Sequence, residues 1–130
     1  MPFTGKILLI DDEPHVRKYI GLIARGLGSP VVLEAGNGED AIARYAAESP
    51  NLVLLDVNLP GMDGVQILAA ILAQDPDAVV VMLTSLANRQ TIEECLRLGA
   101  TSYIRKDTPK EAIFAELSAI IQEIPGVSES

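Results

Sequence analysis

The chain has little of several features that common classes of protein require. It holds one cysteine in 130 residues, so it can form no internal disulfide and offers no cysteine-based metal framework. Its longest unbroken apolar run is the seven residues 67–73, whereas a membrane-spanning helix needs about 20. The shorter apolar run at residues 7–10 leads directly into acidic residues, unlike a signal peptide. We therefore expect a soluble protein of a reducing, cytoplasmic compartment.

Basic residues are also scarce. Ten Lys and Arg stand against 18 Asp and Glu, which gives a formal net charge of −8 with the single histidine neutral. Because nucleic acids are held mainly through clustered Lys and Arg, this balance argues against direct DNA binding. The glycine-rich fingerprints of phosphate loops and dinucleotide sites are missing as well, so nucleotide binding is not expected.

The apolar content, by contrast, is that of a folded domain. Hydrophobic residues make up 48% of the chain and charged residues 22%, which is ordinary globular usage. Such a chain can bury enough surface to offset its conformational entropy, and its length predicts one domain. We expect the domain to occupy residues 1–124, followed by a flexible tail or the stub of a linker at residues 125–130.

Short apolar runs alternate with helical patterns along the chain. Runs that are apolar throughout and rich in Val and Ile are typical of parallel strands buried on both faces. They occupy residues 7–10, 31–33, 52–55, 79–83 and, more weakly, 101–104.

Helical spacing appears between these runs. Apolar residues fall on one helical face in two stretches, which contain Val16, Ile20, Ile23 and Leu27, and Ile113, Leu117, Ile120, Ile121 and Ile124. Shorter helices fit residues 39–48, 64–74 and 88–98. Pro14 and Pro109 lie just inside the first and last helices, and Gly28, Gly99 and the pair Asp75-Pro76 close helices. Five strands alternating with five helices predict an α/β fold, a doubly wound parallel sheet with helices on both faces.

Polar residues follow four of the five predicted strands. Asp11, Asp12 and Glu13 follow the first strand, Asp56 ends the third, Thr84 and Ser85 follow the fourth, and Lys106 follows the fifth. In an open parallel sheet, ligands bind beyond the carboxyl ends of the strands. We therefore expect these side chains to meet at one edge of the sheet.

The chemistry of this set points to phosphoryl transfer. Three converging carboxylates need a cation, and an open site of oxygen ligands suits Mg²⁺. Asp56 follows four apolar residues, where an unpaired carboxylate is costly, so a functional interpretation is favoured. The metal and Lys106 would neutralise a phosphoryl group, and the Thr84 hydroxyl would donate a hydrogen bond to it.

The motifs at these strand ends resemble those of a known family. They read ILLIDDE at residues 7–13, LLDVNLPGMDG at 54–64, LTS at 83–85, GA at 99–100 and YIRK at 103–106. In this order and in a βα frame, over residues 5–123, the chain resembles a receiver domain of two-component response regulators. The resemblance implies the flavodoxin-like strand order 2-1-3-4-5.

The resemblance also implies roles for individual residues. Asp56 would accept a phosphoryl group from a histidine kinase or a phosphotransfer protein, with Lys106 pairing with that group. Mg²⁺ would be held by Asp12 and Asp56 directly, by Asp11 through water and by the backbone carbonyl of Asn58. Thr84 would move toward the phosphoryl group and Tyr103 would swing inward, altering the surface of the fourth helix, fifth strand and fifth helix for a downstream protein or output domain. Homodimerisation on phosphorylation would fit this scheme.

Such a protein is not a conventional enzyme, since it would catalyse only its own phosphorylation and slow hydrolysis. Two departures from the family pattern concern this chemistry. Asp107 follows Lys106 where proline is usual, and its charge is expected to weaken the hold of Lys106 on phosphate. Leu86 stands at a position that varies in the family, where an apolar side chain is expected to slow hydrolysis.

Other interpretations stay open at this stage. A receiver-like module that binds proteins without phosphorylation is one alternative, and a Mg²⁺-dependent phosphatase is a weaker one, because Asn58 replaces its usual second acid. Asp12 could simply cap the first helix. Thr84 could be a cap or turn residue before the fourth helix, Lys106 a surface lysine and Tyr103 a half-buried strand aromatic. Cys95 is expected in the core and His15 in solvent.

Overall fold

The computed structural model describes residues 4–57, 59, 61–84 and 89–124. Over these residues, five strands alternate with five helices. The elements are β1 (Lys6–Ile10), α1 (Pro14–Arg25), β2 (Val31–Ala35), α2 (Gly38–Glu48), β3 (Leu52–Asp56), α3 (Gly64–Gln74), β4 (Val80–Thr84), α4 (Arg89–Leu98), β5 (Ser102–Arg105) and α5 (Lys110–Gln122). The α/β prediction is confirmed. The expected tail at 125–130 and the residues Asn58, Ser85 and Leu86 lie outside the described residues.

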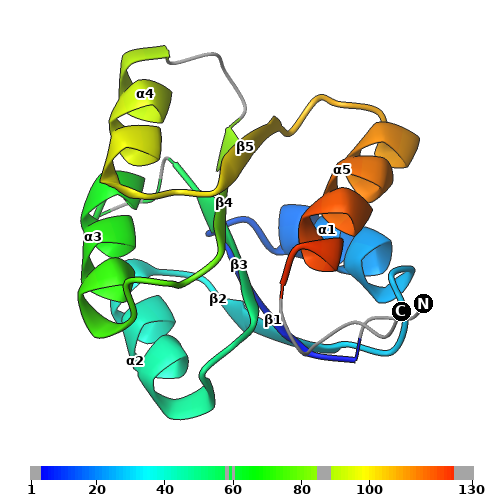
Figure 1. Ribbon diagram of the computed structural model, residues 1–130, viewed down its shortest axis with the longest axis horizontal. Coiled ribbons are helices and arrows are strands. Elements are labelled where there is room, and N and C mark those ends of the chain that lie inside the picture. The colour runs from blue at the N-terminus through cyan, green and yellow to red at the C-terminus, as the bar shows by residue number, and fades with distance from the viewer. Residues whose placement is uncertain (1–3, 58, 60, 85–88, 125–130) are drawn as a thin grey trace.

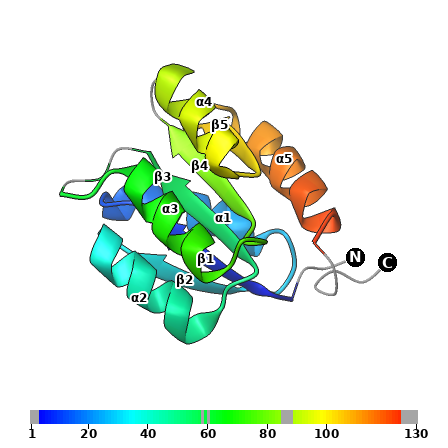
Figure 2. The same ribbon diagram turned by 60° about the vertical axis from the view of Figure 1, so that its left-hand side comes forward.

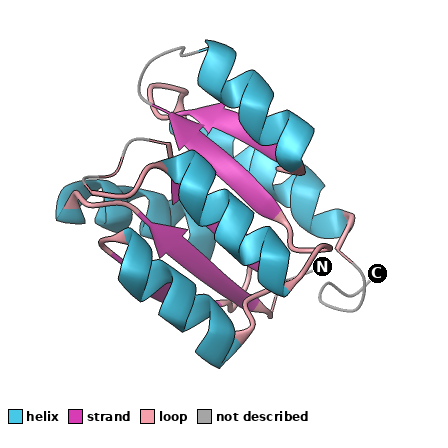
Figure 3. Cartoon of the chain, turned by 90° about the vertical axis from the view of Figure 1, so that its left-hand side faces the viewer, coloured by secondary structure: helices cyan, strands magenta, loops and turns pink. Residues whose placement is uncertain are grey.

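The strands form one sheet in the order β2-β1-β3-β4-β5, and each neighbouring pair is parallel. This is the order that the resemblance implied. Helices α1 and α5 lie on one face of the sheet and α2, α3 and α4 on the other (Figure 1). Figure 3 shows the three-helix face from the front, with its helices side by side over the strands.

The core has two halves because side chains alternate across each strand. Along β1, Ile7 and Leu9 pack with α1 and α5, while Leu8 and Ile10 pack with α2 and α3. All four are fully buried. Burying one such side chain contributes roughly 1.5–3 kcal/mol before the conformational entropy is counted, so the three central strands hold the fold together.

The prediction that every strand is buried on both faces is wrong for the two edge strands. Val31 at the start of β2 is 51% exposed and Tyr103 in β5 is 45% exposed, whereas every residue of β3 and β4 is buried. An edge strand has a neighbour on one side only, so its apolar residues are partly uncovered.

Most predicted helix ends agree with the structure. Pro14 is the first residue of α1, Gly99 follows α4 with a φ of +128°, and Asp75 caps α3. Two predictions are wrong. Pro109 precedes α5 as its N-cap instead of lying inside it. Helix α1 ends at Arg25 with Gly26 as its C-cap, so Gly28 (φ +151°) belongs to the turn that leads into β2.

No helix within the described ranges combines the length and the apolar character that crossing a bilayer requires.

Candidate functional site

The parallel strands bring their carboxyl ends to one edge of the sheet (Figure 2). Asp11 follows β1, Asp56 is the last residue of β3, Thr84 is the last residue of β4, and Lys106 follows β5. Backbone hydrogen bonds continue the sheet past these ends: Val57 N donates to Leu83 O at 2.9 Å and Lys106 N to Thr84 O at 2.7 Å. The sheet therefore sets the relative positions of the polar side chains.

Three carboxylates gather at this edge. One oxygen atom from each of Asp11, Asp12 and Asp56 lies within 4.8 Å of the others. Asp11 and Asp56 are buried, whereas Asp12 is exposed, so the cluster opens to solvent at Asp12. An all-oxygen donor set with one open side suits Mg²⁺, a hard cation that retains several of its waters.

Lys106 supplies the positive charge of the cluster. Its Nζ atom lies 2.6 Å from Asp11 Oδ2 and 3.2 Å from Asp56 Oδ2, and its side chain is 13% exposed. Burial alone lowers the pKa of Lys106, but the hydrogen bond to Asp11 and the charges of Asp56 and Asp11 outweigh it, so this pKa lies above its ordinary value. Three ionised carboxylates and one ammonium leave two negative charges, which a divalent cation would balance.

Asp12 does not cap the first helix. Glu13 is the N-cap of α1 and makes no side-chain cap hydrogen bond. Instead the backbone N–H of Glu13 donates to Asp11 Oδ1 at 2.9 Å. The turn is therefore closed by the buried acid, and Asp12 is left exposed beside the cluster.

The loop after Asp56 is anchored by close packing at the start of α3. Gly64 N donates to Val57 O at 3.0 Å, and a Cβ atom on Gly64 would lie only 2.8 Å from Val57 Cα. Asp63 caps α3 by accepting from Gln66 N at 2.9 Å, while Gln66 Oε1 accepts from Asp63 N at 3.1 Å. These contacts hold Val57, directly after the buried acid, against the start of α3.

Thr84 borders a surface hollow between α4 and β5. The hollow measures about 440 Å³ and its lining includes Thr84, Tyr103, Arg105, Arg89 and Leu96. Thr84 is buried, while Tyr103 is exposed on β5. Tyr103 is thus a strand aromatic with 45% of its surface exposed, which agrees with its interpretation as half-buried, and it borders the hollow.

Asp107 is directed away from the acidic cluster. Its two carboxylate oxygens accept from Arg105, Oδ1 from Nε at 3.1 Å and Oδ2 from Nη2 at 2.8 Å. Lys106 meanwhile lies against Asp11 and Asp56. The charge of Asp107 is thus engaged by the Arg105 guanidinium.

Sequence reasoning missed Arg17. The Arg17 guanidinium donates from Nη1 to the carbonyl oxygen of Asp11 and from Nε to Glu34 Oε1, the latter at 2.9 Å. Its position on α1 suggested only a solvent-facing basic residue next to the exposed His15. The contact between Arg17 and Glu34 joins a helix to a strand, so the spacing of residues along the helix cannot predict it.

Two further residues lie away from the site. Cys95 is fully buried in the core under α4, as predicted, and burial is the main cause that raises the pKa of its thiol. The His15 side chain is 78% exposed, with Nε2 3.8 Å from Glu13 Oε2, in agreement with the prediction that it is solvated.

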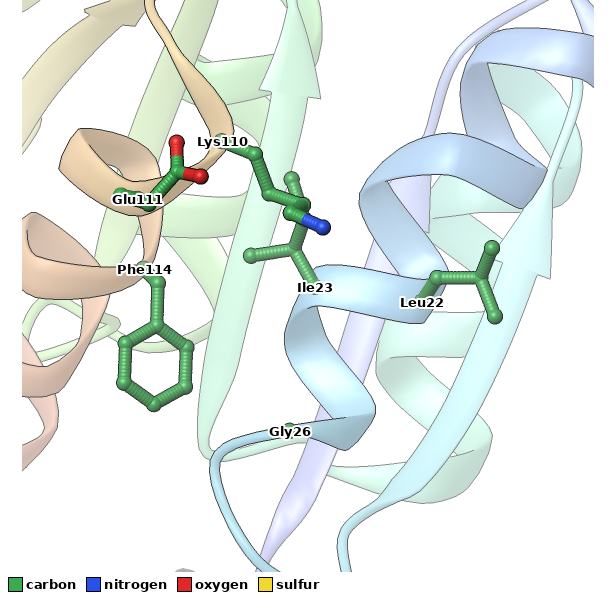
Figure 4. A pocket seen from close by; sticks show the side chains of 6 residues that line it. All are labelled: Leu22, Ile23, Gly26, Lys110, Glu111 and Phe114. Atoms are coloured by element: carbon green, nitrogen blue, oxygen red, sulfur yellow. The ribbon is translucent and has the colours of Figure 1, made fainter.

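A second hollow of about 360 Å³ lies between α1 and α5 (Figure 4). Lys110 extends across it from the start of α5 toward α1, above the ring of Phe114. Its lining contains none of the clustered acids, so it is separate from the candidate metal site.

Known proteins are similar to this chain in sequence and in fold. The family model of the response regulator receiver domain matches residues 7–118. The chemotaxis protein CheY of Listeria monocytogenes is 33% identical over 112 residues, which cover 86% of this chain and 94% of that protein. Among solved structures, the CheX-CheY-BeF3-Mg²⁺ complex from Borrelia burgdorferi is similar at a TM-score of 0.84 and 28% identity, covering 92% of this chain and 90% of that one. The BeF3-activated DrrB receiver domain has a TM-score of 0.78 at 26% identity, covering 95% and 100%.

Proposed function

The chain belongs to the response regulator receiver family, and from that premise we propose that it is a Mg²⁺-dependent switch in which Asp56 accepts the phosphoryl group. The observation that carries the proposal is the position of Asp56: it is 3% exposed at the end of a central strand, with Lys106 Nζ 3.2 Å from its Oδ2 atom. Two further carboxylates, those of Asp11 and Asp12, lie close enough to Asp56 to hold a metal ion with it.

The proposed step is a transfer between a phosphohistidine donor and the Asp56 carboxylate. A carboxylate oxygen attacks phosphorus, the O–P bond forms, and the P–N bond to the donor imidazole breaks with its electron pair left on nitrogen. Lys106 stabilises the charge on the transferred group, and the Thr84 hydroxyl donates to one of its oxygens once it is bound. Mg²⁺, when bound by Asp11, Asp12 and Asp56, supplies further charge neutralisation.

Reversal of the switch is the attack of water on the same phosphorus. The O–P bond to Asp56 then breaks, inorganic phosphate departs, and the Asp56 carboxylate is regenerated. The partners follow from the reaction: a histidine kinase or phosphotransfer protein as donor, and a downstream protein or output domain that binds the surface of α4, β5 and α5. Homodimerisation through the phosphorylated form is part of the same proposal.

The alternative of a phosphorylation-independent binding module has less support than the sequence suggested. Its one indication was the negative charge of Asp107 next to Lys106. Because Asp107 binds Arg105, it leaves the pairing of Lys106 with the buried acids intact.

Incubation with acetyl phosphate tests the proposal. Intact mass should show one phosphoryl adduct that requires Mg²⁺ and is released by hydroxylamine, as an acyl phosphate is. Asp56→Asn, which keeps the shape of the side chain, should give no adduct, whereas Asp77→Asn at the opposite edge should behave as the wild type. An unmodified wild type that also fails to bind beryllofluoride would refute the phosphoryl switch.

A further inference from the structure

Arg17 connects three elements at the rim of the acidic cluster. Its Nη1 atom donates to the Asp11 carbonyl oxygen, and its Nε atom donates to Glu34 Oε1 at 2.9 Å. The Arg17 side chain is 18% exposed although it belongs to a surface helix, while that of Glu34 is 47% exposed. The guanidinium therefore joins α1 and β2 to the loop that carries the acids.

The carbonyl group that accepts from Arg17 lies between two acids of the cluster. It belongs to the peptide bond between Asp11 and Asp12, so its direction fixes the peptide plane that relates the two carboxylates. The other polar atoms of Asp11 are also engaged. Its N–H donates to Ala35 O at 3.1 Å, its Oδ1 accepts from Glu13 N at 2.9 Å, and its Oδ2 pairs with Lys106 at 2.6 Å.

Among these contacts, the one from Arg17 is made by a side chain that reaches in from outside the cluster. The N–H and Oδ1 contacts are to neighbouring backbone, and Lys106 belongs to the phosphoryl site itself. Without Arg17, the carbonyl of the Asp11–Asp12 peptide would lose this partner, while the Asp11 N–H in the preceding peptide would keep its bond to Ala35 O. Rotation of the Asp11–Asp12 peptide would move the two carboxylates relative to each other, and a metal site tolerates little such movement, because its ligands must be held close to their bound geometry.

We infer that Arg17, oriented by Glu34, is a positioning residue that sets the affinity of the acidic cluster for Mg²⁺. The inference rests on the proposed function, since it assumes that Asp11, Asp12 and Asp56 hold the metal. Glu34 acts in two ways: it fixes the direction of the guanidinium, and it balances the Arg17 charge near the cation site.

The sign of the effect separates positioning from charge. A positive guanidinium near a cation site repels the cation, so an electrostatic role alone predicts that removing Arg17 tightens Mg²⁺ binding. A positioning role predicts the opposite, because the acidic loop loses its fixed geometry. Outer-sphere partners of metal ligands typically contribute about 10–100-fold to metal affinity, and we expect a loss of about tenfold in Arg17→Ala.

Calorimetric titration of the full chain with Mg²⁺ alone tests the inference. Arg17→Ala should bind about tenfold more weakly than the wild type. Arg17→Lys keeps the positive charge but lacks the planar guanidinium with its several N–H donors, and it should also bind Mg²⁺ more weakly. Lys18→Ala, which removes a charge from an exposed neighbour on the same helix, should leave the affinity unchanged. At saturating Mg²⁺, Arg17→Ala should accept a phosphoryl group from acetyl phosphate at the wild-type rate, since the loss is in affinity.

Equal or tighter Mg²⁺ binding by Arg17→Ala would overturn the inference while leaving the proposed function intact. A wild type that binds no Mg²⁺ would instead refute the proposed function, and this inference with it. If Arg17→Ala fails to fold, Arg17→Lys decides, because it keeps the positive charge and changes only the guanidinium geometry. Weaker binding by Arg17→Lys at unchanged unfolding free energy would support positioning, and unchanged binding would contradict it.

Discussion

Lys106 pairs more closely with Asp11 than with the proposed phosphoacceptor: its Nζ atom lies 2.6 Å from Asp11 Oδ2 and 3.2 Å from Asp56 Oδ2. The buried acid beside the phosphoacceptor therefore keeps the ammonium in place before any phosphoryl group arrives. Lys106 serves two carboxylates at once, so replacing it affects both the stability of the domain and its chemistry.

Lys106→Met should destabilise the metal-free protein. Two buried carboxylates lose their ammonium partner, and removal of one member of a buried charged pair costs about 3 kcal/mol. Denaturant unfolding measures the change, and Mg²⁺ should restore part of it by supplying positive charge. Lys110→Met, an exposed lysine at the start of α5, serves as the control. Equal stability of the two variants would show that Lys106 does not offset the buried charge.

Mg²⁺ should raise the unfolding free energy of the wild type. A ligand that binds only the folded state stabilises it by about 2.7 kcal/mol at a hundred times its dissociation constant. Asp12→Asn removes the exposed carboxylate of the cluster and should abolish most of this gain, whereas Asp77→Asn should keep it. Thermal unfolding with Mg²⁺ and then with a chelator measures the difference. A full Mg²⁺ gain in Asp12→Asn would remove that residue from the metal site.

Gly64→Ala should damage the site through the backbone. The new Cβ atom would lie 2.8 Å from Val57 Cα and 2.9 Å from Val57 O, so the end of β3 or the start of α3 must move. We expect a loss of about 2 kcal/mol in unfolding free energy and slower phosphorylation. Gly21→Ala is the matched control, because its Cβ meets only the end of the Arg25 side chain at 3.1 Å. A Gly64→Ala variant as stable and as reactive as this control would contradict the prediction.

Asp107→Ala should leave phosphorylation at its wild-type rate. The carboxylate binds Arg105 at the surface, where both side chains are about half exposed, and such pairs contribute at most about 1 kcal/mol. The rate with acetyl phosphate, read by intact mass, checks this. A marked acceleration would mean that the charge of Asp107 does act on Lys106.

Stability should fall at high pH through Tyr45. Burial, with the charge and hydrogen bond of Asp75, raises the pKa of Tyr45 from 10.0 to about 12. The folded state thus favours the neutral phenol, so this contribution is complete below pH 10 and is lost as pH rises toward 12. Absorbance of the phenolate should show a titration near 12 that is missing in Tyr45→Phe. Persistence of that titration in the variant would assign it to another tyrosine.

The central strands were predictable because burial on both faces leaves an unbroken apolar run, as at residues 52–55. The edge strands carry a weaker pattern, since one neighbour leaves Val31 and Tyr103 partly exposed. The strand order could be predicted only from the family resemblance, because the apolar runs do not determine which strands pair.

Polar residues at strand ends were predictable for a geometric reason: parallel strands place their carboxyl ends together. Contacts between elements were not predictable in the same way. Arg17 meets Glu34 across a helix and a strand, and no periodicity links the two positions. Asp107 was expected to act on its neighbour in sequence, Lys106. Asp107 instead lies in the turn that Thr108 N closes on Arg105 O, and its carboxylate binds the Arg105 guanidinium.

The two sides of Asp56 differ in how freely their atoms can move. On one side stands Asp11, whose four polar atoms are already held by strand, turn, Lys106 and Arg17. On the other side Thr84 borders about 440 Å³ of open space that reaches Tyr103. We therefore expect a group added to Asp56 to displace atoms toward the hollow, because the contacts of Asp11 resist movement on the other side. In that case the fold itself, with β1 held in place, sets the direction of the structural change before any partner protein binds.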